Sequence, residues 1–141
     1  MATAKWGAGT GSRSSNLAST TLDSLANGST STFVTYDNSS NLDLYAVVTL
    51  KLGSLNPTTG AAVKLHVFTS DGTDTPDNTA SVGGGEIYQE PLTTGSGAKV
   101  VNFRIRLHPH SMRLCVTNNS NVSFAASSNE LYVKPHNEAI A

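Results

Sequence analysis

Apolar and polar residues alternate most regularly in the stretch LDLYAVVTLKL, residues 42–52. The apolar side chains at every second position are Leu42, Leu44, Ala46, Val48, Leu50 and Leu52. A period of two residues is typical of a strand with one buried face. A helix over the same stretch would carry leucines on every side and would have no polar face. We therefore predict a long, half-buried strand at 42–52, beside which the other apolar segments pair or pack.

Shorter segments with the same alternation follow along the chain, separated by clusters of Gly, Asn, Pro and Ser. They cover residues 31–36, 62–69, 86–92, 101–107, 112–117, 122–125 and 131–133. About eight strands without a convincing helix predict an all-β fold, a two-sheet antiparallel sandwich of the jelly-roll type, with a barrel as the nearest alternative. The long strand and 62–69 form either a hairpin or a crossing between sheets, and the pattern does not decide the topology.

Residues 1–30 differ from the predicted sandwich because small and polar residues dominate them. Their apolar positions are Trp6, Leu17, Leu22 and Leu25. We interpret this segment as an extended N-terminal arm whose apolar side chains dock on the body or on a neighbouring subunit, with a flexible tail as the alternative. The sandwich then spans 31–134, and the tail at 135–141 has no pattern that assigns it.

Composition narrows the classes of partner. Charged residues make up 13% of the chain, the net charge is −1 and the pI is near 6.4. Nucleic-acid binders usually carry a basic face, so nucleic acid is not an expected partner. No apolar run resembles a signal peptide or a membrane span, which predicts a protein that is intracellular when made and does not contact a membrane. Cys115 is the single cysteine, so an intrachain disulfide is impossible.

Two groups of residues are candidate metal ligands. Asp71, Asp74 and Asp77 share one polar loop and could hold calcium, but their spacing is not that of an EF-hand. His108 and His110 flank Pro109 without a third ligand nearby. We interpret the first group as a solvated loop and the second as a turn that ends a strand, and we predict no metal and no cofactor.

Catalytic motifs are not apparent. The chain contains no G-x-S-x-G, and its serines and histidines cannot be grouped with an acid without assuming a fold. Cys115 lies between Leu114 and Val116 in a predicted strand, where an inert, small side chain is expected. We predict no catalytic residues and no enzyme activity, which leaves a small hydrolase as a disfavoured third hypothesis.

Three arginines are candidates for binding a partner. If 101–107 and 112–117 pair as neighbouring strands, Arg104, Arg106 and Arg113 share or adjoin one outward face, near Lys51. Guanidinium groups bind carboxylates through two parallel hydrogen bonds, so such a face could recognise a partner. A solvated polar strand face is the alternative.

The order of short motifs resembles a known family. The motifs are, in order, Trp6-Gly7, TLDSLANG at 21–28, a short strand, Asn41-Leu42 at the start of a long apolar strand, and a later loop rich in Asp and Gly. This order resembles that of the jelly-roll head decoration or cement proteins of tailed bacteriophages. The likeness extends over residues 6–110. It implies a virion protein, made in the host cytoplasm, that binds the outer surface of the capsid as a homodimer or homotrimer and bridges major capsid subunits. Such proteins have no catalytic residues.

The sequence therefore predicts a non-enzymatic capsid decoration protein whose partners are the major capsid protein and itself. Trp6, Leu17, Leu22 and Leu25 would supply apolar contacts, and Arg104, Arg106 and Arg113 polar ones. The alternative is a carbohydrate-binding sandwich of a phage tail or host-attachment protein, although sugar binders usually expose aromatic platforms and this chain has one Trp and four Tyr.

Overall fold

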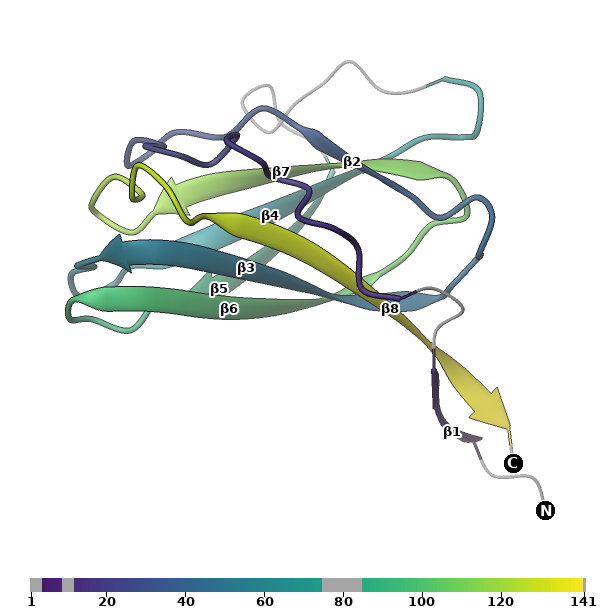
Figure 1. Ribbon diagram of the computed structural model, residues 1–141. Coiled ribbons are helices and arrows are strands. Elements are labelled where there is room, and N and C mark those ends of the chain that lie inside the picture. The colour runs from purple at the N-terminus through teal and green to yellow at the C-terminus, as the bar shows by residue number, and fades with distance from the viewer. Residues whose placement is uncertain (1–3, 9–11, 75–84, 141) are drawn as a thin grey trace.

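The computed structural model describes residues 4–8, 12–74 and 85–140, and within these ranges it consists of strands and connecting loops without a helix (Figure 1). The strands are β1 (Ala4–Ala8), β2 (Val34–Asp37), β3 (Tyr45–Leu55), β4 (Ala62–Thr69), β5 (Glu86–Pro91), β6 (Gly97–Arg106), β7 (Ser111–Asn119) and β8 (Glu130–Ile140). They form two four-stranded antiparallel sheets with the orders β1-β8-β3-β6 and β2-β7-β4-β5. We call these sheet 1 and sheet 2.

The strand pairing is nested from the ends of the chain towards its middle. β1 pairs with β8, β2 with β7, β3 with β6 and β4 with β5, and two further pairings, β3 with β8 and β4 with β7, complete the sheets. This pattern is a long hairpin rolled into two layers, which is the jelly-roll topology. The predicted all-β, two-sheet antiparallel fold is thereby confirmed. The connection from β3 to β4 crosses between the sheets and is not a hairpin.

The core lies between the two sheets and follows from the alternation in the sequence. Ala46, Val48, Leu50 and Leu52 of β3 are buried, as the pattern predicts. They belong to one apolar cluster with inward-facing residues from four other strands: Val63, Leu65, Val67, Val101, Phe103, Ile105, Met112, Leu114, Val116, Leu131 and Val133. Burial of these side chains is the main term that favours the folded state.

The long strand begins three residues later than predicted. Leu42 and Leu44 are 57% and 51% exposed, whereas Asp43 between them is buried. The Asn38 side chain explains this reversal, because its amide nitrogen donates to the Asp43 carbonyl at 2.8 Å and its oxygen accepts from the Asp43 amide at 3.0 Å. Asn137 also donates to the Asp43 carboxylate at 2.8 Å. These bonds hold residues 38–43 as a tight loop, so the strand starts at Tyr45.

A second difference is that 122–125 is not a strand. Asn118, which is fully buried, donates from its side chain to the carbonyls of Leu25 and Val122, both at 2.8 Å. The segment after Val122 therefore folds as a loop that passes over the end of β3 at Gly53. A side chain at Gly53 would collide with this loop, since its Cβ would lie 2.5 Å from the Ser127 carbonyl oxygen.

The N-terminal segment lies along the edge of β8. The Ser14 amide donates to the Val133 carbonyl and the Leu17 amide to the Leu131 carbonyl, both at 2.9 Å. In return the Ser14 hydroxyl and the Asn16 side-chain oxygen accept from the amides of Val133 and Leu131 at 2.9 and 3.0 Å. Residues 14–17 thus satisfy the edge of a strand that would otherwise be open.

The two chain ends also pair with each other. Residues 135–140, which the sequence pattern left unassigned, continue β8, and residues 4–8 pair with 136–140. Beyond His136, β8 has no pairing with β3. β1 and the end of β8 therefore leave the sandwich together as a two-stranded ribbon (Figure 1). We call residues 4–8 with 136–140 the terminal ribbon.

The position of Leu22 in the core gives a first prediction. We expect Leu22→Ala to lower the free energy of unfolding by about 2–4 kcal/mol, because the side chain is 1% exposed and its loss leaves a cavity. The matched control is Leu44→Ala, which removes an exposed leucine side chain and should cost less than about 0.5 kcal/mol. Urea unfolding of the three proteins measures both. Equal losses for the two variants would contradict the placement of residues 17–25 against the core.

Candidate functional site

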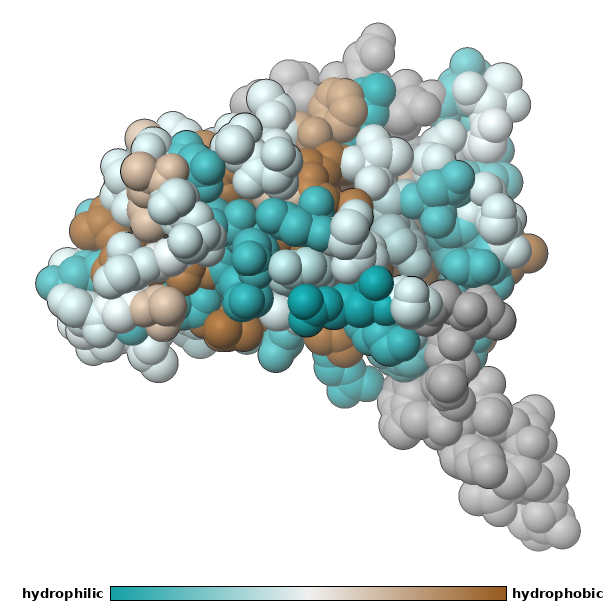
Figure 2. All heavy atoms as spheres, in the orientation of Figure 1, coloured by the Kyte–Doolittle hydropathy of each residue, from teal (hydrophilic) through white to brown (hydrophobic). Residues whose placement is uncertain are grey.

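The outer face of sheet 1 gathers most of the polar side chains of three neighbouring strands. Because Ala46, Val48 and Leu50 face the core, the alternate residues of β3 and their partners on β6 and β8 face outward. Listed from β6 through β3 to β8, the four rows are Arg106, Tyr45 and His136; Arg104, Val47 and Lys134; Asn102, Thr49 and Tyr132; and Val100, Lys51 and Glu130. Figure 2 shows hydrophilic residues gathered on the face turned to the viewer.

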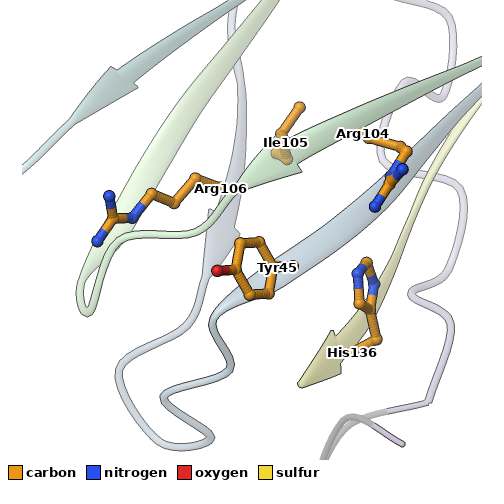
Figure 3. Close-up of a pocket in the computed structure, with 5 residues that line it drawn as sticks. All are labelled: Tyr45, Arg104, Ile105, Arg106 and His136. Atoms are coloured by element: carbon orange, nitrogen blue, oxygen red, sulfur yellow. The ribbon is translucent and has the colours of Figure 1, made fainter. Parts of the chain in front are cut away.

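A groove lies at the end of this face from which the terminal ribbon leaves. Its volume is about 340 Å³, and it is lined by Tyr45, Arg104, Ile105, Arg106 and His136. The Tyr45 and His136 rings stack, with 5.7 Å between their centroids and 20° between their planes. In Figure 3 the Arg104 side chain is directed towards these two rings, and Arg106 extends on the other side of Tyr45. Arg104, Arg106 and the two stacked rings therefore line one open space, which we call the arginine groove.

Cations outnumber carboxylates on this face, although the whole chain has a net charge of −1. Arg104 and Arg106 are exposed, and Lys134 is exposed in the row next to the groove. Further along, the Arg13 guanidinium lies 3.7 Å from the centre of the Tyr132 ring. Lys51 forms an ion pair with Glu130 at 2.9 Å. Glu130 is the acidic residue of the four rows, so a positive potential covers the face from Arg13 to Arg106.

Arg113 is not part of this face, which corrects the prediction that it adjoins Arg104 and Arg106. That prediction required β6 and β7 to pair, but β6 belongs to sheet 1 and β7 to sheet 2. The residues between them cross from one layer to the other. Arg113 lies instead on the outer face of sheet 2, where its guanidinium is 3.9 Å from the centre of the Phe33 ring.

The apolar residues of the predicted arm lie against the chain's own core. Leu22 is fully buried in it, and Leu17 and Leu25 pack against it as partly buried residues. In this structure Leu22 is thus not available to a partner, which corrects its assignment as an intersubunit contact. Docking on the chain's own body, the other possibility left open by the sequence, accounts for it. Trp6 lies in β1, where only the backbone is described.

A small polar cluster joins the two sheets beside the arginine groove. Glu86 of β5 accepts from the Tyr88 hydroxyl at 2.6 Å and lies 2.9 Å from Nε2 of His108, which follows β6. The hydrogen bond from Tyr88 is the main cause that lowers the pKa of Glu86, with smaller contributions from His108 and Arg106. Burial and the neighbouring carboxylate raise the pKa of Tyr88. This cluster stabilises the contact between β5 and the connection from β6 to β7.

The candidate metal ligands have structural roles where they are described. Asp71 accepts the backbone amides of Thr73 and Asp74 at 2.8 and 2.7 Å, which is the geometry of a capped turn. Asp77 lies outside the described residues. His108 is engaged with Glu86, and Cys115 is buried. Over residues 4–8, 12–74 and 85–140, no group of three His, Cys, Asp or Glu side chains could hold a metal ion.

Sequence reasoning found two members of the arginine groove and missed the others. Tyr45 was assigned to a strand, but its neighbours across the sheet were unknown. His136 was in the unassigned tail, so nothing indicated that it reaches Tyr45. The outward-facing residues of β3 were the signal in the sequence that could have indicated this site. Each strand that pairs with β3 places its own outward-facing residues beside them, in the same rows.

No helix long and apolar enough to cross a membrane occurs in the parts of the chain that the structure describes.

Comparisons with known proteins add little beyond the fold. No protein-family model and no curated protein match this sequence. Among solved structures, a family 35 carbohydrate-binding module from an environmental isolate is similar over 100% of this chain and 97% of its own, with 11% identity and a TM-score of 0.45. An exo-beta-1,3-galactanase from Phanerochaete chrysosporium is similar over 94% of this chain and 29% of its own, with 15% identity and a TM-score of 0.41.

A third similar structure is the enzymatically active domain of tailspike protein 4 from bacteriophage CBA120. The similarity covers 99% of this chain and 19% of that one, with 8% identity and a TM-score of 0.34. At such identities and TM-scores these likenesses carry no information about what the present chain binds. The function has to be argued from its own residues.

The cluster at Glu86 gives a second prediction. We expect Glu86→Gln to lower the free energy of unfolding by about 0.5–1 kcal/mol at pH 7, because it removes two charge-assisted hydrogen bonds at a partly exposed site. The folded-state pKa of Glu86 lies below its ordinary value of 4.5. The higher unfolding free energy of the wild type relative to Glu86→Gln should therefore be fully present above pH 4.5. It should disappear as the pH falls through the lowered pKa of Glu86.

Urea unfolding at a series of pH values measures this difference, with Glu90→Gln on the same strand as the matched control. A stability difference between the wild type and Glu86→Gln that stays constant down to pH 2 would contradict the assignment. An equal loss in Glu90→Gln would contradict it too.

Proposed function

We propose that this chain is a non-catalytic structural protein that attaches to the outer surface of a larger protein assembly, as a capsid decoration protein does. Its partners are then the major capsid protein and further copies of itself, and its place is the outside of the virion. The observation that carries this proposal is the terminal ribbon.

The ribbon has two open edges and lies outside the two stacked sheets. Among the described strands, β1 pairs with β8 alone, and β8 beyond His136 pairs with β1 alone. An isolated two-stranded ribbon is marginally stable in water, and its unpaired amides and carbonyls are a template for pairing with another chain. Addition of a strand at such an edge is a common mode of protein recognition. A ribbon of this kind is best explained as an element that is completed by a neighbour.

The rest of the surface is compatible with attachment. The arginine groove is lined by two arginines, a tyrosine, an isoleucine and a histidine, with no carboxylate among its lining residues. Because charged residues make up 13% of the sequence, repulsion between copies is weak. Many weak contacts repeated by the symmetry of a shell give strong binding overall.

The ribbon gives a third prediction, which tests this function. Two variants open the ribbon without touching the core: deletion of residues 1–8, and Ala139→Pro, which removes an amide from the strand opposite Lys5. We expect both to remain folded, with less than about 1 kcal/mol lost from the free energy of unfolding, because β8 beyond His136 does not pair with β3 and the core residues that the structure describes lie outside the ribbon. We expect both to lose at least about tenfold in affinity for the assembly.

The assay mixes each protein with empty heads assembled from the major capsid protein of the genome that encodes this chain, and measures cosedimentation. The control is Ile87→Thr, which lies on an edge strand of sheet 2, whereas the ribbon belongs to sheet 1. This variant should bind as the wild type does. Absence of binding by the wild type, or unchanged binding by both ribbon variants, would contradict the proposal.

A second candidate function is supported by the arginine groove. A concave site with a few converging polar groups is the usual form of a small-ligand site, and its volume of about 340 Å³ lies at the lower end of their range. This observation favours a carbohydrate-binding module, the alternative that the sequence left open. The terminal ribbon and the arginine groove meet at His136, but each can be altered by variants away from that residue and tested separately.

A further inference from the structure

We infer that the arginine groove binds a linear acidic polysaccharide, whose sugar residues carry carboxylates. This inference rests on the second candidate function and names the class of its ligand.

The first argument is the placement of the two guanidinium groups. Arg104 and Arg106 are two residues apart on β6, so they project from the same face about 6.6 Å apart along the strand. Both are exposed. Guanidinium groups bind carboxylates through two parallel hydrogen bonds, which gives orientation as well as charge. The groove is therefore suited to an anionic group that is planar, as a carboxylate is.

The second argument is that hydrogen-bonding groups other than guanidinium groups lie among the cations. Tyr45 and His136 line the groove itself, and Thr49 and Asn102 lie two rows further along the same strands. The Thr49 hydroxyl donates to the Asn102 side-chain oxygen at 2.7 Å, which fixes the orientation of this amide. Hydroxyls and amides match sugar hydroxyls, and the guanidinium groups match a carboxylate. A sugar acid presents both kinds of group on each residue.

The third argument concerns the length of the surface. Cations continue from the groove along the sheet, with Lys134 in the row of Arg104 and Arg13 above Tyr132 in the row after it. The groove is open, and the rows succeed one another along the direction of the strands. A linear polymer with a negative charge on each residue can contact several rows at once, whereas a single sugar would use one.

Two other polyanions fit the face less well. Single-stranded nucleic acid is bound largely by stacking of bases on aromatic side chains. Here Tyr45 is stacked with His136, and Tyr132 lies under Arg13, so each ring already has a side chain against it. Acidic peptides are commonly held through backbone pairing at a sheet edge. At the edge strand β6 such a peptide would lie beside the sheet and not across the rows of its outer face, because β3 in the middle is paired on both sides.

The test uses Arg104→Gln combined with Arg106→Gln, and Arg113→Gln on sheet 2 as the matched control. The probe is polygalacturonate, and fully methyl-esterified polygalacturonate supplies the same polymer without its charge. We expect the wild type to bind the acid form and not the ester. We expect the double variant to bind at least about tenfold more weakly, and Arg113→Gln to bind within about twofold of the wild type.

A second variant guards against a folding defect. Arg104→Lys with Arg106→Lys keeps both charges and loses the two-pronged geometry, and it should bind with an affinity between those of the wild type and the glutamine variant. Circular dichroism verifies that each protein is folded before affinity is measured by calorimetry.

Several results would overturn the inference. These are no binding of polygalacturonate, equal binding of the ester, equal loss in Arg113→Gln, or equal or tighter binding of poly-L-glutamate or single-stranded DNA. Ala139→Pro changes the ribbon three residues beyond His136 and keeps the groove, so it should bind polygalacturonate as the wild type does. Failure of this inference is therefore distinguishable from failure of the attachment through the terminal ribbon.

Discussion

The structure depends on how β8 satisfies its two edges. One edge pairs with β3 along 130–136. The other is covered first by residues 14–17 and then by β1. Leu131 and Val133 also face the core, so the segment at 14–17 forms hydrogen bonds with the backbone of two core residues. The first part of the chain is for this reason a structural component of the sandwich, although its composition resembles that of a loop.

The same arrangement brings the two candidate binding elements together. His136 is the residue at which β8 leaves β3, and it pairs with Tyr45 on one side and with Ala8 on the other. It therefore belongs both to the arginine groove and to the base of the terminal ribbon. A partner that contacts the ribbon lies next to the groove, so contacts at the two elements can influence each other through this one residue. Arg113 lies on the outer face of sheet 2, where it is packed over Phe33.

The sequence was informative where one face of a strand is buried. Alternation identified the core residues of β3, β6 and β7 because a shift by one residue would turn each set of apolar side chains towards solvent. It failed at Leu42 and Leu44, where the hydrogen bonds of Asn38 and Asn137 to Asp43 outweigh the local pattern. It also failed at 122–125, where the buried amide of Asn118 organises a loop. Both failures involve hydrogen bonds from a side chain to the backbone four or five residues away, which an alternation of apolar and polar residues does not reveal.

The pairing of strands was likewise beyond local reasoning. The expected group of three arginines assumed that successive strands are neighbours, whereas in a jelly roll β4 and β5 are the only successive strands that pair. Once the nested pairing is known, the rows of the outer face follow directly from the sequence. The terminal ribbon had no signal of its own, because residues 135–140 carry no clear alternation and acquire their conformation from β3 and β1.

Hydrogen exchange along β8 tests most directly whether this strand is held by the body up to residue 136 and by a neighbour beyond it. In the free chain, the account predicts that amides at 131–134 exchange only through global unfolding, and that amides at 137–140 exchange many times faster. On binding to its assembly, the amides at 137–140 should become protected while those at 131–134 change little. Protection of 137–140 equal to that of 131–134 in the free chain would contradict the account.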